Sequence, residues 1–438
     1  MRVGITAFYL LLSAPAFLPV PTWAAETEIW SLHGQATLVE QYHPAFKSAY
    51  LGPNSLDHES AGRETVDLTL YAGLRLWQGG EAYANPEIDQ GFGLSNTVGA
   101  AGFPSGEAYK VGKSSPYFRL QRLFFRQSFD LGGDIENVEA GPNQLGGSRT
   151  AKNLIFTAGK ISPTDIFDTN SYAHDPKSDF LNWSLIDAGA FDYAADAWGY
   201  SYGLVGEWTQ DWWTLRAGLF NLSRVPNTTE LERGFNQFEA VAEAEGRHTF
   251  LGRTGKIKLL GFVNRGRMGG YGDAVRLAQA TGTPPDMVPV RRYASRPGGA
   301  LNIEQEVSDT VGAFARISLN DGSKEAYEFT EINRSVALGL SVKGTDWGRP
   351  DDRWAIAGVV NMLSDSAKTY FAAGGMGILI GDGQLRRYGT ENILETYYDA
   401  QIVKGLNVAL DYQLIAKPAY NADRGPVSVL GFRLHGEF

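Results

Sequence analysis

The sequence contains no cysteine, which excludes a disulfide framework and a thiolate site for a metal. Its six histidines are scattered without the spacing of metal ligands, so we expect neither a metal nor a cofactor. Positive charge is also scarce, because 39 Lys and Arg face 49 Asp and Glu, a net charge of −10. A chain this acidic is poorly suited to a polyanion, and we expect no nucleic-acid partner.

Long hydrophobic runs are missing beyond the N-terminus. Residues 1–25 contain a basic residue, Arg2, then an apolar stretch interrupted by Pro15, and finally the small pair Ala24-Ala25, which is typical of a secretory signal peptide. Residues 26–438 have no apolar run long enough for a spanning helix and no linker, so we predict one domain there. An exported chain of this kind is either a soluble protein or a membrane barrel, whose strands need only about ten residues each.

Aromatic residues (12%) and 52 glycines are abundant, and apolar residues recur with period two. In residues 65–76, Val66 and Leu68 fall on one face while Asp67 and Thr69 fall on the other, as in a half-buried strand. The same alternation recurs at 30–38, 213–219, 311–319, 336–342 and 406–414. We therefore predict an all-β chain. A short helix at 237–245 is an alternative for that stretch, and four prolines predict a loop over 275–299.

The last strand favours a membrane barrel over a β-sandwich. Residues 430–438 alternate apolar and polar side chains and end on an aromatic, Phe438. A terminal aromatic strand is the feature that outer-membrane barrels present to their assembly machinery, which we expect as a partner together with membrane lipid. Tryptophans also cluster near strand ends, as at Trp77, Trp208 and Trp347, where a membrane interface favours them.

Several longer motifs, ordered along the mature chain, give a more specific indication. They are 33–37, 41–46, 85–87, 90–95, 101–109, 122–127, 165–170, 172–176, 180–183, 191–196, 381–383, 411–413 and 418–427. In these motifs the chain resembles the carbohydrate-selective porin family, OprB. The resemblance implies an antiparallel transmembrane β-barrel of about sixteen strands in the outer membrane of a Gram-negative bacterium. It also implies passive diffusion of sugars rather than an enzymatic reaction, and it leaves both a monomer and a homo-oligomer open.

A sugar pore needs groups that replace part of the water shell of the solute. Arginine forks donate to hydroxyl oxygens and carboxylates accept from hydroxyls. The charged residues on the polar faces of the strands are therefore the candidates for lining the pore and contacting sugar: Asp67, Arg75, Arg122, Arg126, Glu207, Arg216, Arg316 and Arg433. Arg122 and Arg126 are four residues apart, so we expect them on one face as a positive ladder.

The glycine-rich segment 90–113 is the candidate for a loop that folds into the lumen. Glycine permits tight turns, and an exposed loop has little use for so many aromatics. Its expected contacts with the solute are Phe92, Phe103, Glu107, Tyr109 and Lys110. A loop that only caps the barrel from outside is the alternative.

Two other functions remain open at this point. The first is a general or anion-selective porin, in which the arginines act through their field rather than by hydrogen bonding. The second is an exported β-sandwich that binds or hydrolyses polysaccharide with paired carboxylates. A requirement for detergent would exclude the second, and block of ion current by sugar would disfavour the first.

Overall fold

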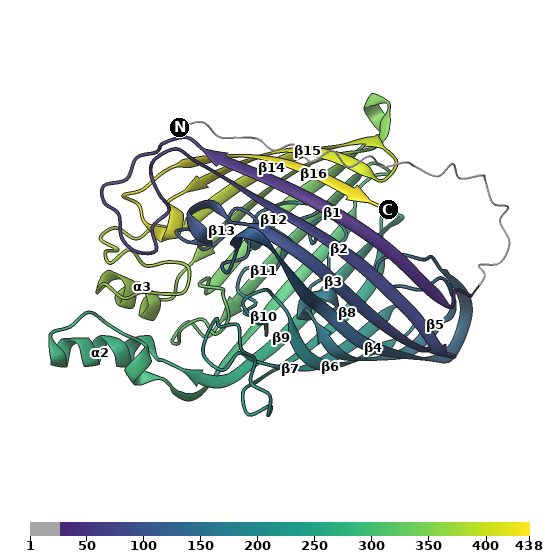
Figure 1. Cartoon of the computed structure of the whole chain (residues 1–438), viewed down its shortest axis with the longest axis horizontal. Coiled ribbons are helices and arrows are strands. Elements are labelled where there is room, and N and C mark those ends of the chain that lie inside the picture. The colour runs from purple at the N-terminus through teal and green to yellow at the C-terminus, as the bar shows by residue number, and fades with distance from the viewer. Residues whose placement is uncertain (1–26) are drawn as a thin grey trace.

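The chain forms a closed barrel of sixteen antiparallel strands, seen from the side in Figure 1. This computed structural model describes residues 27–438, and the predicted signal peptide lies outside the described residues. Each strand pairs with its neighbours in the sequence, and β1 pairs with β16 to close the barrel. The strands are β1 Trp30–His43, β2 Ala61–Trp77, β3 Gly80–Gly91, β4 Lys113–Val138, β5 Gly147–Ile161, β6 Ser201–Thr209, β7 Trp213–Asn221, β8 Phe238–Phe250, β9 Arg253–Met268, β10 Arg292–Glu306, β11 Val311–Asn320, β12 Arg334–Gly344, β13 Arg349–Met362, β14 Glu391–Val403, β15 Leu406–Ala416 and β16 Val427–Glu437.

The connections differ in length on the two sides of the barrel. Odd-numbered strands are followed by loops, of which 92–112 and 162–200 are among the longest, whereas most even-numbered strands are followed by tight turns such as 78–79 and 404–405. In outer-membrane barrels the short turns face the periplasm and the long loops face outward. The start of β1 and the end of β16 lie on the turn side, so that side is periplasmic.

The helices are short and belong to the loops. They are α1 Trp183–Ile186, α2 Tyr271–Thr281 and α3 Asp365–Ala372, with 3-10 turns at η1 Leu94–Thr97, η2 Pro163–Asp165, η3 Val288–Val290, η4 Thr345–Trp347 and η5 Pro418–Tyr420. Helices α2 and α3 contact each other beyond the strand ends on the loop side (Figure 1). No helix among residues 27–438 is long and apolar enough to cross a membrane.

The barrel is apolar outside and polar inside. On β2, Val66, Leu68 and Leu70 are exposed, while Asp67 and Thr69 are buried. This arrangement inverts that of a soluble protein and fits lipid on the outside. Exposed tryptophans follow the periplasmic rim, namely Trp77, Trp208, Trp212, Trp347 and Trp354.

The closing strand follows the predicted alternation. In β16, Leu430 is exposed, whereas Arg433 and His435 are buried inside the barrel. Beyond the strand, the Phe438 N–H donates to the Gly34 carbonyl (2.9 Å), and the Gly34 N–H donates to the Phe438 carbonyl (2.7 Å). The terminal aromatic therefore completes the seam between β16 and β1.

Two local predictions are wrong. The alternative of a helix at 237–245 fails because this stretch is part of β8. Its glutamates (Glu239, Glu243 and Glu245) are buried in the lumen while Ala242 and Ala244 face outward, so burial overrides the helical propensity of these residues. The predicted loop over 275–299 contains most of α2 and the first half of β10 instead. Pro297 is tolerated in β10 because of the side to which it points. Its carbonyl accepts from the Asp321 N–H (2.8 Å) just beyond the end of β11, and the nitrogen of the same residue points to that side too. The missing proline N–H therefore removes no hydrogen bond from the interior of the sheet.

Candidate functional site: a constriction inside the barrel

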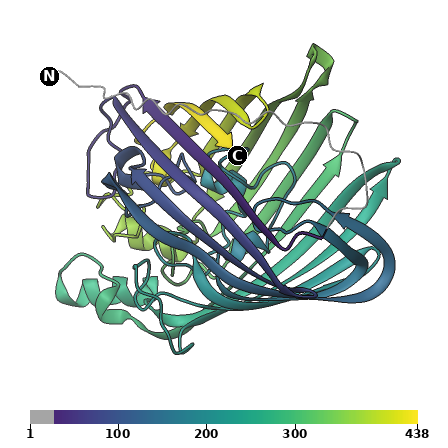
Figure 2. The same cartoon turned by 45° about the vertical axis from the view of Figure 1, so that its right-hand side comes forward.

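Two loops enter the barrel from the outer side: the β3–β4 loop (92–112) and the β5–β6 loop (162–200), which are visible inside the strands in Figure 2. The two loops bind each other, because the Gly106 N–H donates to the Leu181 carbonyl (2.7 Å) and the Trp183 N–H donates to the Phe103 carbonyl (3.2 Å). A cavity remains between the two loops and the barrel wall.

Carboxylates of the barrel wall fix both loops. Glu391 accepts from the N–H groups of Ala101 (3.0 Å) and Gly102 (2.7 Å) in the first loop. Glu395 accepts from those of Leu181 (2.5 Å) and Asn182 (3.0 Å) in the second. A buried carboxylate that accepts several N–H groups satisfies both itself and the loop backbone. These contacts show why the loops lie inside instead of extending into solvent.

Asp192 belongs to the β5–β6 loop itself and anchors this loop to other parts of the barrel. Its carboxylate accepts from the backbone N–H groups of Tyr327 (2.6 Å) and Phe329 (3.2 Å) in the β11–β12 loop. It also pairs with Arg296 of β10 at 2.5 Å, and both side chains are fully buried.

Two of the candidate arginines, Arg316 and Arg433, are each only 2% exposed and bind loop backbone. Arg316 donates to the carbonyls of Leu185 (2.8 Å) and Ala173 (2.8 Å). Arg433 donates to the carbonyl of Asp179 (2.7 Å) and pairs with Asp399. Their guanidinium groups are thus occupied by the inserted loop.

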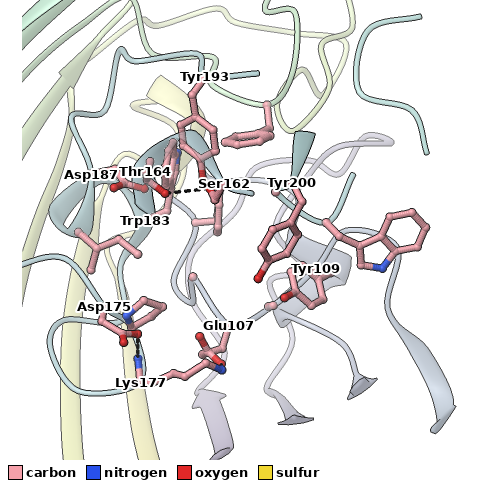
Figure 3. A pocket seen from close by; sticks show the side chains of 18 of the residues that line it. Glu107, Tyr109, Ser162, Thr164, Asp175, Lys177, Trp183, Asp187, Tyr193 and Tyr200 are labelled. Carbon is pink, nitrogen blue, oxygen red and sulfur yellow. Dashed lines mark hydrogen bonds and ion pairs between the residues drawn. The ribbon is translucent and has the colours of Figure 1, made fainter. Parts of the chain in front are cut away.

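The remaining cavity has a volume of about 260 Å³ (Figure 3). One side of it is aromatic. The rings of Phe103 and Trp183 are stacked, with centroids 5.6 Å apart and planes 12° apart, and Tyr193 and Phe329 meet Trp183 edge-on. Trp183 is 2% exposed, and its Nε1 has no hydrogen-bond partner among residues 27–438.

The other side of the cavity carries ion pairs. Lys177 Nζ lies 2.7 Å from Asp67 Oδ1 and 2.6 Å from Glu107 Oε2. Arg122 makes a two-pronged contact with Asp165, at 2.8 and 2.6 Å. In Figure 3, Glu107 and Lys177 lie opposite Trp183 and Tyr193. Each of these two cations is therefore balanced by a neighbouring carboxylate.

Titration of Glu107 is shifted by this environment. Burial raises the pKa of Glu107 to about 8, although the Lys177 ammonium opposes the shift. Burial also raises the pKa of Asp187 well above its usual range, with Asp168 adding to the shift. The carboxyl groups beside the cavity are thus less charged at neutral pH than their number implies.

The candidates of the β3–β4 loop separate into two groups. Phe103, Glu107, Tyr109 and Lys110 line the cavity. The Tyr109 hydroxyl donates to Glu87 (3.3 Å), and the Lys110 ammonium donates to the Ile378 carbonyl. Phe92 instead borders a groove on the outside of the barrel, beside Tyr42 and Phe432.

The candidates nearer the periplasm line a second, wider cavity of about 1170 Å³, namely Arg75, Arg126, Glu207 and Arg216. Arg216 pairs there with Glu207 (3.1 Å), Glu243 (2.8 Å) and Glu245 (3.0 Å). Arg122 and Arg126 both face the interior in unbroken register with β3, but Arg122 borders the constriction cavity and Arg126 the wider one. They border different cavities and form no continuous ladder.

Sequence reasoning missed the residues that the β5–β6 loop contributes: Asp165, Lys177, Trp183, Asp187 and Tyr193. The available signal was the length of the loop, since connections this long inside compact domains are commonly functional. Among the described residues, no group of three or more His, Asp and Glu side chains could hold a metal ion.

A closed barrel that is apolar outside, with a lumen narrowed at one level by inserted loops, defines a porin with restricted permeation. The family model of the carbohydrate-selective porins, OprB, matches residues 54–438, and the chain belongs to this family. The protein is therefore an outer-membrane channel of a Gram-negative bacterium through which carbohydrates diffuse, and the predicted family, fold, location and function are confirmed.

Solved structures agree on the fold. The chain is similar to Pseudomonas putida OprB at high pH, with a TM-score of 0.70 and 16% identity over 93% of this chain and 94% of that one. It is also similar to the low-pH structure of the same protein (TM-score 0.51, 13% identity, 93% and 92% covered). A third similar structure is the outer-membrane channel DcaP of Acinetobacter baumannii (TM-score 0.53, 12% identity, 95% and 98% covered). No curated protein sequence matches the chain.

Proposed function

We propose that the 260 Å³ cavity selects neutral carbohydrates about the size of a single sugar ring. The partly buried ring of Phe103, which is stacked on the buried Trp183 beside the cavity, carries this proposal, because an aromatic face is suited to the C–H side of a pyranose. The volume lies just below the roughly 300 Å³ at which small-molecule pockets begin, which favours one ring over several. The hydroxyl groups of the sugar would form hydrogen bonds with the polar residues on the opposite side of the cavity.

The ion pairs support a neutral solute. Arg122 is balanced by Asp165, and Lys177 by Asp67. An anion pore works through unbalanced positive charge, which this half of the cavity does not present. In our proposal Arg122, Lys177 and Glu107 donate to or accept from sugar hydroxyls, and the buried Arg316 and Arg433 hold the loop that forms the cavity.

A planar-bilayer assay with a sugar panel tests this function. We expect glucose to block the ion current at lower concentration than maltose or longer maltodextrins. Equal, weak block by all of them together with strong anion preference would overturn the proposal in favour of an anion porin.

The variant Trp183→Phe sharpens the test, because it keeps the ring but removes the Nε1–H donor. We expect the glucose concentration for half-block to rise about three- to tenfold, the worth of one hydrogen bond. Trp212→Phe is the matched control, since Trp212 is exposed at the periplasmic rim. An unchanged half-block in Trp183→Phe would remove this donor from the site.

For the surroundings of the barrel, we propose that membrane lipid covers the outer face and that the assembly machinery binds β16 with its terminal Phe438. A homo-oligomer would need a contact through the same outer face. Cross-linking of the detergent-purified protein measures the oligomeric state directly.

A further inference from the structure

The connection between β4 and β5 is unlike the other periplasmic turns. β4 is 26 residues long, and its pairing with β3 ends at Gln127. β5 pairs with β6 only from Asn153 onward. The residues between these points form a two-stranded ribbon that extends beyond its neighbours, drawn as the long blue ribbon that curves at the lower right of Figure 2.

The ribbon is interrupted at a pair of glycines. Gly132 and Gly133 have φ values of 101° and 90°, which side chains rarely adopt, and the register of β4 against β5 shifts on both sides of Gly132. Such bulges bend and twist a ribbon strongly. The bend allows the end of the ribbon to turn back toward the barrel.

The tip of the ribbon, residues 139–147, lies against the inner wall, and we call this segment the tongue. Leu145 is 2% exposed and joins the apolar cluster of Tyr83 and Phe124. The Leu145 N–H donates to the Tyr83 hydroxyl (3.2 Å), and Arg75 donates to the Gly146 carbonyl (3.2 Å). The Tyr83 hydroxyl in turn donates to Glu81 (2.6 Å), which pairs with Arg75 at 3.1 Å.

A second clamp holds Asn143, which has a left-handed backbone (φ 55°). Its carbonyl accepts from Arg126 (2.9 Å), and its side-chain oxygen accepts from the Asn85 amide (2.8 Å). Asn85 is paired in register with Arg122 of the constriction. The tongue therefore reaches into the lumen almost to the level of the sugar cavity.

We propose that the tongue forms a second narrowing of the permeation path, in series with the constriction and on its periplasmic side. Gln144 and Leu145 border the 1170 Å³ cavity, and Arg216 and Arg247 border it as well. A solute that leaves the constriction passes between the tongue and this charged wall. Arg126, in this arrangement, is a positioning residue for the tongue and makes no contact with sugar.

Closure of the barrel does not require the tongue. Neighbouring strands are joined by turns as short as Lys404-Gly405 between β14 and β15. A two-residue turn would join β4 and β5 equally well. Instead, five inward-facing side chains hold the longer segment inside the barrel: Arg75, Glu81, Tyr83, Asn85 and Arg126.

Single-channel recording with the full-length protein tests the proposal. Replacing 139–146 by Asn-Gly should raise the conductance by up to about twofold, the limit that applies when the two resistances in series are equal. Gln144→Trp should lower it, since this side chain borders the exit cavity. Val307→Trp is the control for added bulk, because Val307 is exposed in the periplasmic turn after β10. Arg126→Gln should raise the conductance, and Arg126→Lys should restore it by donating again to Asn143.

The half-blocking glucose concentration, measured in the same recordings, should be unchanged in the Gln144, Val307 and Arg126 variants. Unaltered conductance in both the shortened protein and Gln144→Trp would overturn the proposal. An equal decrease in Val307→Trp would also overturn it. If the tongue variants change conductance while glucose blocks none of the proteins, the sugar site is wrong and the tongue stands.

Discussion

Arg122 and Asp165 join the barrel wall to the inserted loop by a two-pronged ion pair, with N–O distances of 2.8 and 2.6 Å, at the edge of the 260 Å³ cavity that we propose selects sugars. Arg122→Ala leaves the Asp165 carboxylate unpaired and removes a donor to sugar. We expect the half-blocking glucose concentration to rise about tenfold, or ~1.4 kcal/mol. Arg265→Ala, on the outer face of β9, should leave it unchanged in the same bilayer assay. The same rise in both variants would contradict a role in the cavity.

Ion selectivity should depend on pH through Glu107. Because burial raises the pKa of this carboxyl to about 8, it is mostly neutral at pH 7 and ionised at pH 9. The raised pKa also makes stability depend on pH. The contribution of the neutral Glu107 carboxyl to folding is complete below the pKa that this group has in the unfolded chain, and it is lost as the pH rises through 8. We expect reversal potentials in a KCl gradient to shift toward cation preference between pH 7 and 9. In Glu107→Gln this shift should disappear, and its persistence would place the titrating group elsewhere.

The β3–β4 loop should become mobile without its wall anchor. Glu391 is fully buried and accepts from Ala101, Gly102 and Ala419. Glu391→Ala leaves three N–H groups unpaired, so we expect a destabilisation of about 3 kcal/mol. Trypsin should then cleave the loop at Lys110. The exposed Glu64→Ala is the control, and equal cleavage of both variants would show that Glu391 is not the anchor.

Closure of the barrel should be sensitive to a side chain at Gly34. The Phe438 ring occupies the space that a Cβ at this position would need. Gly34→Val should therefore lower stability by about 1–3 kcal/mol through overpacking and reduce the folded fraction on unheated SDS gels. Gly261→Val is the control, because no atom lies within 4 Å of a Cβ added there. Normal folding of both variants would argue against the seam contact.

The barrel was predictable from sequence because its determinants are local. Alternation in β2 and β16 depends on residues two positions apart, so the lipid face can be read directly. The secondary structure of β8 was harder to predict, because alanine and glutamate suit both a helix and a barrel strand that faces lipid on one side and the water-filled lumen on the other.

The site was only partly predictable because its determinants are distant in sequence. Glu391 binds Gly102, 289 positions away, and Lys177 of the β5–β6 loop pairs with Asp67 on β2. No periodicity marks such pairs. Arg316 and Arg433 have the same pattern as Arg122 in the sequence, and only the packing of the β5–β6 loop distinguishes an anchor from a residue beside the cavity.

The buried carboxylates that anchor the inserted loops also have an electrical consequence. Glu391, Glu395 and Asp192 each hold loop backbone by several hydrogen bonds, so the obstructing segments have little freedom to swing across the lumen. Current through the channel should stay at one steady open level, without the brief closures that a wandering loop produces. A small pore built in this way would show low current noise, and each sugar molecule that binds in it would appear as a discrete blocking event in the recording.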